Sequence, residues 1–424
     1  MIGLLLALQV GMVDSLPRVT LAEALGQGVR LEPNYVRALS LVNTAEWGRT
    51  AALSALVLPS INASTDYTLL SVEQFFLGTG NRTNSTASAR LDGRLELFTG
   101  GRKLAELSRA RAELEGSQAS ELQARYAAAL LIENAYYDVL GLRQLLEVAN
   151  ARYRRAEEQL VVARARVVSG AAVQSDSLQI RLELNQARVS VLRAEAALLN
   201  SRLDLGRRVG RRGALDAVPL PELPLEIPLG LPDAITEALQ QGPDYRIARA
   251  NERQADALLR QRRAAYFPVI FAQGSYTLSD TSWFPTAVNR GVLTFGLSLP
   301  LWDNAQRELN VARARATRDV SRAVREDLER GVDADVTTAY NAFVTARAAL
   351  DLEREAVLVA RENFRVQDTR YRAGASTILD LLEAQDQLTA AEAAVVTADY
   401  AARLAVAGLE AILGRRLLND RTEP

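Results

Sequence analysis

The chain has 424 residues, a formal net charge of −1 and a hydrophobic fraction of 48%, a globular balance without the basic excess that would suggest a nucleic-acid partner. It contains no cysteine and no histidine, which excludes thiol chemistry, cysteine-ligated zinc and imidazole catalysis. No run of about 18 or more apolar residues occurs, so no transmembrane helix is expected.

The N-terminal segment is mostly apolar over residues 1–13, a length that suits the hydrophobic core of a secretory signal peptide. No basic residue precedes Arg18, and no Ala-x-Ala cleavage site follows. We interpret residues 1–18 as a degraded or mis-started signal peptide. The alternative is a plain apolar N-terminus.

The first half of the chain is predicted to pass from helix into strand. Residues 19–27 read as a short helix, and a second helix opens at Pro33 and ends before Pro59. The apolar period then changes from helix-like to two, on both sides of a polar turn near 78–84. This alternation predicts a strand hairpin over about 61–98 with one apolar and one polar face.

The polar face of this hairpin carries Arg90, Asp92, Arg94 and Glu96, which suits a water-filled lumen. The strands have about 10 residues or more, the length that spans a bilayer when tilted. Open sheet edges are not tolerated in lipid, so the chain is expected to share a barrel with copies of itself. Two copies would give eight strands and three would give twelve. A half-exposed sheet on a soluble domain is the alternative.

Long helices follow both strand hairpins. No convincing helix breaker occurs between residue 101 and about 168, or from about 304 to 372. At ~1.5 Å per residue each run is on the order of 100 Å long. Helices of this length with alanine-rich faces do not fit a compact domain and indicate an elongated coiled-coil assembly.

Each long helix is predicted to turn back at a glycine, Gly170 or Gly374, into a further helix. In the second of these, apolar and small residues recur at alternating steps of three and four from Leu381 to Ile412, the heptad seam of a coiled coil. Subtracting 204 carries the seam positions from Leu381 to Leu409, with Gly374 and Asp380, onto the first half. The chain therefore consists of two helical-hairpin repeats.

The repeat sets the expected domain organisation. A first repeat covers 19–213 with its hairpin tip near 170, and a Pro-rich extended connector covers 214–230. A second repeat covers 231–416, with a strand hairpin at about 269–301 and a tip near 374. A tail covers 417–424.

The order of these features resembles the TolC family of outer-membrane efflux proteins over about residues 19–416. The resemblance is carried by the repeat, the Pro-ended helices, the strand-to-helix junction at 97–102 and the tip sequence at 371–384. It implies an α+β fold of mainly long α-helices. A homotrimer would form a 12-stranded transmembrane β-barrel, four strands per chain, continued by a periplasmic α-helical coiled-coil barrel.

The resemblance also implies a function without catalysis, cofactor or metal. The chain would lie in the cell outer membrane, surrounded by lipid, and export drugs or toxic small molecules as the exit duct of a tripartite pump. Its partners would be a periplasmic adaptor and an inner-membrane pump. Type I protein secretion and metal-ion efflux use the same kind of channel and stay open as alternatives. More remote are a soluble coiled-coil scaffold and an enzyme using Asp380 with Glu383 or Asp333 with Asp335.

A gate is expected at the second tip. Asp380 and Glu383 lie one helical turn apart on one face, and in a trimer each would form a ring of three carboxylates that attracts cations. The family carries an acidic pair at these positions, which matches directly at Asp380. The alternative is a solvated acidic face near a helix N-terminus.

The family's gate latch joins a tyrosine and an arginine of the second hairpin to an aspartate of the first. Tyr371 matches the tyrosine and Asp176 the aspartate, whereas Ser376 stands in the arginine position. The resemblance implies a Tyr371–Asp176 hydrogen bond without the charge-assisted part of the latch. Plain packing of Tyr371 is the alternative.

The helix tips match the place where adaptors dock in this family. Small residues there would allow close packing against a partner hairpin. The alternative is that the glycines only make the turns. The expected docking residues are Ser169, Gly170, Ala171, Ala373, Gly374 and Ala375.

Overall fold

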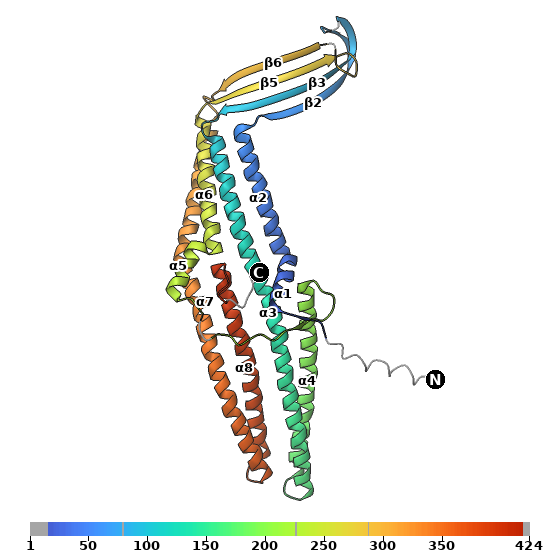
Figure 1. The fold of residues 1–424 in the computed structure, drawn as a ribbon, viewed down its shortest axis with the longest axis vertical. Helices are drawn as coiled ribbons and strands as arrows, with labels where there is room; N and C mark the ends of the chain where they lie inside the picture. Colours follow the sequence, from blue (N-terminus) through green and yellow to red (C-terminus); the bar gives the residue numbers. More distant parts are fainter. Residues whose placement is uncertain (1–15, 79, 225–226, 287, 419–424) are drawn as a thin grey trace, which may run out of the picture. The chain divides into compact units, whose positions relative to one another are not determined.

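A computed structural model describes residues 16–78, 80–224, 227–286 and 288–418. The expected signal segment before residue 16 and the tail beyond Leu418 lie outside these ranges. The chain divides into two compact units (Figure 1), each of which takes segments from both repeats. The helical unit comprises residues 1–38, 121–244 and 330–424, and the sheet unit comprises residues 39–120 and 245–329.

The sheet unit is built on a four-stranded antiparallel sheet in the order β2–β3–β5–β6 (Figure 1). Each sequence hairpin supplies two neighbouring strands, and β3 pairs with β5 to join the hairpins. β2 and β6 are the two edges of this sheet. The strands are β2 (Ser60–Phe76), β3 (Asn81–Phe98), β5 (Val269–Asp280) and β6 (Val288–Ser298).

The second strand hairpin is shorter than the expected 269–301, because β6 ends at Ser298. Pro300 follows two residues later and has no N–H group to donate to a sheet ladder. Strand and helix are then joined through Asn304 and Ala305, which both have positive φ angles.

The register of the sheet gives it two distinct faces. Asp92 of β3 lies opposite Asn62 of β2 and Ser275 of β5, and the neighbouring polar pairs follow the same pattern. The opposite face is apolar, and its large side chains are exposed in the single chain. It includes Ile61, Leu91, Tyr276, Leu293, Phe295 and Leu297.

The helical unit contains two long hairpins, α3 with α4 and α7 with α8 (Figure 1). The heptad seam of α8 is buried at Leu381, Ala384, Leu388 and Leu409, as its spacing predicts. No helix in the described ranges is long and apolar enough to cross a membrane. The helices of the two units together are α1 (Leu21–Gly28), η1 (Val29–Leu31), α2 (Pro33–Val57), α3 (Arg102–Val168), α4 (Gln174–Val209), α5 (Leu231–Gln241), α6 (Pro243–Arg263), η2 (Ala264–Tyr266), α7 (Gln306–Arg372) and α8 (Ile378–Leu413). Residues 39–120 and 245–329 of them belong to the sheet unit.

A short parallel strand pair lies beside α3 in the helical unit, and the sequence periodicity did not predict it. β1 (Arg18–Val19) pairs with β4 (Asp216–Ala217). The buried Tyr136 hydroxyl of α3 donates to the carbonyls of Val19 at 3.2 Å and Val218 at 2.7 Å. These bonds hold both segments that flank the first repeat against the same helix.

Candidate functional site

The two helical tips have the same backbone geometry. Gly170 and Gly374 adopt φ angles of 75° and 80°, the left-handed region that glycine enters without steric cost. Ala171 donates its N–H to the Arg166 carbonyl, and Ala375 donates to the Arg370 carbonyl, both at 2.8 Å. These bonds satisfy carbonyl groups at the ends of α3 and α7. The turn is therefore a sufficient reason for each glycine.

The residues expected to receive an adaptor are all solvent-exposed in the structure, so both tips are accessible for docking. They are Ser169, Gly170, Ala171, Ala373, Gly374 and Ala375.

Arg166 is the side chain that joins the two tips. Its guanidinium lies 4.6 Å from the centre of the Tyr371 ring and donates to the Tyr371 carbonyl. It also donates to the Ala171 carbonyl of its own tip at 3.2 Å. Arg370, its counterpart in the second repeat, donates to the Ala375 carbonyl at 3.3 Å. Arg166 was not among the residues predicted from the sequence, although the offset of 204 between the two arginines was a usable signal.

Tyr371 is almost completely buried in an apolar cluster that all four hairpin helices share, together with Ile180, Ile378 and Leu381. Burial raises the pKa of the Tyr371 hydroxyl; the charge of Asp176 acts in the same direction and Arg166 opposes both.

The Tyr371 hydroxyl has no hydrogen-bond partner within the described residues. The hydrogen bond expected between Tyr371 and Asp176 is therefore absent from this structure. Tyr371 is held instead by packing and by Arg166, while Asp176 acts on it through charge alone.

Ser376 does not reach the first hairpin through its hydroxyl. It donates to the side chains of Gln367 and Asp380, both on the second hairpin, at 3.0 Å each. The three residues matched to the family latch are thus not joined by hydrogen bonds to one another. The cation that contacts Tyr371 comes from the first hairpin, on Arg166.

Asp380 takes part in the cap at the N-terminus of α8. Its carboxylate accepts from the Thr377 backbone N–H at 3.0 Å and the Thr377 hydroxyl at 2.8 Å, and its own N–H donates to that hydroxyl at 3.2 Å. This reciprocal pattern is a capping box. The bond from the Thr377 backbone, followed by the hydroxyl bonds, lowers the pKa of Asp380.

Glu383 lies one turn further along α8 and is exposed, like Asp380. It accepts a hydrogen bond from Gln387 at 3.3 Å. The structure thus places both carboxylates at the tip of the second hairpin, where both remain open to solvent.

Ion pairs connect the two hairpins further from the tips. Arg152 of α3 donates to Glu183 of α4 at 2.6 Å and to Asp386 of α8 at 2.9 Å. Arg155 of α3 pairs with Glu392 of α8 at 3.2 Å. Glu183 is mostly buried and also accepts from Gln385 at 3.0 Å. Together these contacts tie α3 to the second hairpin by charge.

The expected lumen residues lie along one face of β3 in the sheet unit. Arg90, Asp92 and Arg94 face polar partners on both neighbouring strands. The Arg94 guanidinium lies 4.1 Å from the centre of the Phe271 ring. Glu96 pairs with Arg102 at the start of α3. This end of the polar face is therefore organised by ion pairing at the strand-to-helix junction.

These geometries allow gating and ion attraction. No group of three or more His, Cys, Asp or Glu side chains placed to hold a metal ion occurs in the described ranges.

Comparisons with known proteins agree with this architecture. The pyoverdine export outer membrane protein OpmQ of Pseudomonas aeruginosa is 29% identical over 422 residues, covering 90% of this chain and 85% of OpmQ. The cobalt-zinc-cadmium resistance protein CzcC of Cupriavidus metallidurans is 25% identical over 320 residues, covering 72% of each chain.

The same fold occurs in the crystal structure of the outer membrane protein VceC of Vibrio cholerae. The TM-score is 0.78 at 16% identity, over 94% of this chain and 97% of VceC. The model of the outer membrane efflux protein family matches residues 45–211 and 234–415, most of the chain. The chain therefore belongs to the outer membrane efflux protein family, whose members are channels and not enzymes.

Proposed function

We propose that this outer-membrane channel is the exit duct of a tripartite pump that exports small molecules. The sheet is the observation that carries the proposal. It has a polar face continuous over three strands, an apolar face of exposed large side chains, and open edges at β2 and β6. Its strands contain 11 to 18 residues, and about 9–11 suffice to cross a bilayer when tilted.

Open edges in lipid leave unpaired N–H and C=O groups at a cost of several kcal/mol each, so the sheet requires closure. Among the residues that the structure describes, β2 and β6 are not paired with each other. Copies of the same chain can pair β6 of one with β2 of the next. Three copies give a closed barrel of twelve strands around a polar lumen, and we take the homotrimer as the working assembly.

The helical unit supports the same assembly. Leu182 and Leu192 of α4, and Leu352 and Val359 of α7, are all more than half exposed. Apolar side chains on long helices need a partner surface. Neighbouring copies provide that surface if the hairpins stand side by side as the wall of a periplasmic tunnel.

The gate of the proposed tunnel lies at the helical tips. In a trimer Asp380 and Glu383 form two carboxylate rings that attract cations. The Arg166–Tyr371 contact keeps the two tips of each chain together. The exposed tip residues receive the periplasmic adaptor, which links the duct to an inner-membrane pump.

The substrate class is argued by similarity. OpmQ, whose name assigns it to pyoverdine export, matches 90% of this chain, which favours a small-molecule cargo. CzcC, named for cobalt, zinc and cadmium resistance, favours metal-ion efflux as the second candidate. A strain that lacks the channel tests the two candidates. If it loses resistance to organic toxicants but keeps resistance to cobalt, zinc and cadmium, the cargo is a small organic molecule.

The mass of the detergent-extracted protein and its conductance in a planar bilayer test the channel itself. We expect a trimer with cation-selective pores that lose selectivity in Asp380→Asn/Glu383→Gln. Glu362→Gln, an exposed carboxylate of α7, is the matched control and should leave selectivity unchanged. A monomer that is soluble without detergent and shows no conductance would rule out the proposal.

A further inference from the structure

A cavity of about 450 Å³ lies in the sheet unit, where β3 leads into α3. The end of α2, the start of β2, the end of β3 and the first turn of α3 each contribute to its walls. Its charged residues are Arg94, Glu96 and Lys103. Arg94 is paired with Ser60 of β2 and lies two residues along from Asp92, so this wall belongs to the polar face of the sheet.

The carboxylate of Glu96 already has a cationic partner. It pairs with Arg102 of α3, which does not line the cavity and also donates to Glu106 at 2.9 Å. The negative charge of Glu96 is therefore compensated from outside the cavity, and Glu96 forms no ion pair with the two cations that line it.

Neither cation of the cavity forms an ion pair within the described part of the chain. The Lys103 ammonium has three donors and uses one of them for the Glu96 carbonyl, at 3.1 Å. The Arg94 guanidinium lies 4.1 Å from the centre of the Phe271 ring, and it donates no hydrogen bond to another described residue. The cavity thus offers two positive groups whose remaining donors are available to an acceptor.

The second repeat shows how the same junction is built with a carboxylate. The offset of 204 aligns Lys103 with Arg307 and Thr99 with Asp303. Each cation donates its backbone N–H to the aligned side chain, at 3.4 Å for the Thr99 hydroxyl and 3.1 Å for the Asp303 carboxylate. Each also donates from its side chain to the carbonyl seven residues earlier, at 3.1 and 2.8 Å. The two junctions therefore share the same hydrogen-bond pattern.

The charges of the two junctions differ. Asp303 pairs with the Arg307 guanidinium at 3.2 Å, whereas Thr99 carries no charge. The offset also aligns Arg94 with the uncharged Ser298. Beyond the ion pair of Glu96, the junction of the first repeat thus lacks one carboxylate and has one additional cation.

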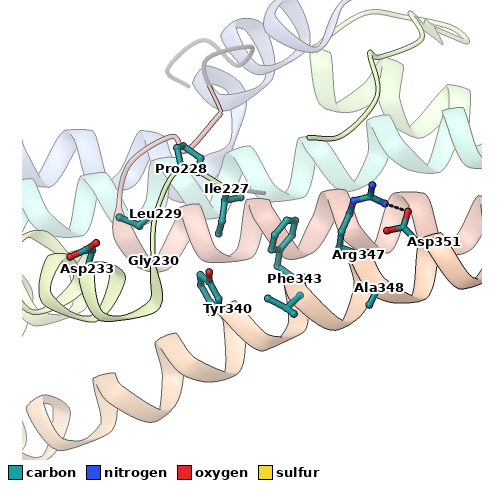
Figure 2. A pocket seen from close by; sticks show the side chains of 11 residues that line it. Ile227, Pro228, Leu229, Gly230, Asp233, Tyr340, Phe343, Arg347, Ala348 and Asp351 are labelled. Carbon is teal, nitrogen blue, oxygen red and sulfur yellow. Dashed lines mark hydrogen bonds and ion pairs between the residues drawn. The ribbon is translucent and has the colours of Figure 1, made fainter. Parts of the chain in front are cut away.

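A cavity in the helical unit shows the compensated arrangement (Figure 2). It has a volume of about 650 Å³ and lies between residues 227–230 and α7. Its cation, Arg347, donates to Asp351 at 2.7 Å, the dashed line in Figure 2, and both residues line the cavity. The cation of that cavity has a carboxylate of its own, unlike Lys103 and Arg94.

Two uncompensated cations beside apolar side chains fit an organic molecule that carries an oxyanion. A carboxylate or phosphate accepts charge-assisted hydrogen bonds from an ammonium, which acts as a point charge, and from a guanidinium fork, which donates in pairs. Ala55, Leu58 and Pro59 provide apolar contacts for the rest of the molecule. The volume of the cavity lies within the range of about 300–1,000 Å³ that small-molecule sites occupy.

We propose that this cavity binds the oxyanion group, a carboxylate or a phosphate, of the small molecules that the duct exports. Lys103 and Arg94 hold the group, and the apolar side chains at the end of α2 contact the body of the molecule. This cargo class rests on the proposed function, since the polar face of the sheet lines a lumen only in the closed barrel. The proposed duct thereby gains a class of cargo, organic anions.

Lys103 is the only lysine among the chain's 50 basic residues. Reductive methylation with isotope-labelled formaldehyde therefore places one dimethyl-lysine probe in the cavity and keeps its positive charge. Its NMR signal is followed in the detergent-extracted full-length protein. We expect citrate, the organic anion used as the probe ligand, to move this signal and saturate, while sodium chloride at equal ionic strength does not. A signal that responds equally to both salts would mean charge screening alone and overturn the proposal.

Arg94→Gln should weaken citrate binding roughly tenfold, the effect of one lost charged hydrogen bond. Arg109→Gln removes an exposed cation of α3 that does not line the cavity, and it should leave the affinity unchanged. Thr99→Asp supplies the carboxylate that the second repeat has at Asp303, and it should abolish saturable binding. Thr99→Asn, of similar size without the charge, should retain it and controls for folding. If Thr99→Asp binds citrate as tightly as the parent chain, Lys103 is not a ligand and the proposal fails.

A lipid headgroup is the other source of an oxyanion. Phosphatidylglycerol added to the micelles should leave the Lys103 signal in place, and displacement of citrate by this lipid would overturn the assignment to cargo. Conductance measured in parallel distinguishes failure of the site from failure of the duct. A conducting trimer whose Lys103 signal ignores citrate would refute the oxyanion site alone. A soluble monomer that binds citrate would refute the duct and, with it, the assignment to cargo.

Discussion

Arg166 of the first hairpin lies 4.6 Å from the centre of the Tyr371 ring on the second, and it donates to the Tyr371 carbonyl. The two residues are 205 positions apart in the sequence. In the family latch the arginine lies on the second hairpin, at the position that Ser376 occupies in this chain. Here the arginine that contacts Tyr371 lies on the first hairpin. In the proposed gate, the contact between the two hairpins therefore involves an arginine outside the set matched to the family latch.

Arg166→Ala should weaken the closed tip. The mutation removes a cation–π contact, about 0.5–2 kcal/mol, and charged hydrogen bonds to two carbonyls. A net loss of about 1–2 kcal/mol changes the closed-to-open ratio by a factor of roughly 5–30. Single-channel recording should show a matching rise in the open fraction.

Arg370→Ala is the control for this prediction. Arg370 occupies the equivalent position of the second repeat and donates to Ala375 in its own tip. It should change the open fraction far less than Arg166→Ala. Equal effects of the two mutations would mean that tip stability, and not the contact between hairpins, sets the gate.

Tyr371→Phe should leave gating and stability nearly unchanged. The similarity to the family latch favours the opposite result, but the structure leaves the buried hydroxyl without a partner. Removing an unsatisfied buried hydroxyl is neutral or mildly stabilising. The ring that Arg166 covers is retained in phenylalanine. Tyr371→Leu, which removes the ring, is the contrasting variant. Of the two Tyr371 variants, only Tyr371→Leu should raise the open fraction.

Much of the fold could be predicted because it rests on periodic patterns. Alternation with a period of two predicted the strands, and the repeat at 204 predicted the paired hairpins; the fold is confirmed by its likeness to solved channels. β1 and β4 escaped prediction since two residues carry no periodicity. They form because Tyr136 of a distant helix binds both segments.

The site was less predictable, for a different reason. Which side chain meets Tyr371 depends on how two hairpins pack, and sequence spacing within one hairpin does not encode that. Asp380 was expected to act through its charge in a ring, or else as part of an acidic face near a helix N-terminus; the structure shows it capping α8 through Thr377. The position was therefore predictable, whereas the bonds made there were not.

Arg152→Met should destabilise the hairpin pair. The mutation leaves Glu183, with 9% of its side chain exposed, without its arginine partner. Loss of one partner of a fully buried pair costs about 3–5 kcal/mol, and we expect about 2–3 here because Arg152 stays partly exposed. Thermal unfolding of the detergent-solubilised protein should show the loss.

The double variant Arg152→Met/Glu183→Met should recover most of this stability, because apolar replacement of both partners is often neutral. Arg154→Met, at an exposed position on the same turn of α3, is the surface control. If the double variant is as unstable as Arg152→Met, packing of the arginine and not its charge supports the hairpins.

Asp380 should keep its charge to an unusually low pH. Bonds from Thr377, first from its backbone N–H and then from its hydroxyl, lower the Asp380 pKa from the ordinary 3.8. Because the pKa is lowered in the folded state, the stabilisation of α8 by the cap is fully present at pH values above the ordinary pKa of aspartate. It is lost as the pH falls through the lowered pKa of Asp380. Cation selectivity that depends on Asp380 should follow the same course and persist below the ordinary aspartate range.

Thr377→Val sharpens this last prediction. It removes the hydroxyl bond to Asp380 and keeps the backbone one, so the loss of selectivity on acidification should move to higher pH. Thr397→Val makes the same chemical change on the exposed side of α8, where the hydroxyl donates to the Ala393 carbonyl. It should leave the pH at which selectivity is lost unchanged. Reversal potentials measured in a pH series on Glu383→Gln channels isolate the Asp380 ring. A Thr377→Val titration identical to that of Thr397→Val would mean that Asp380 caps its helix without setting the selectivity of the pore.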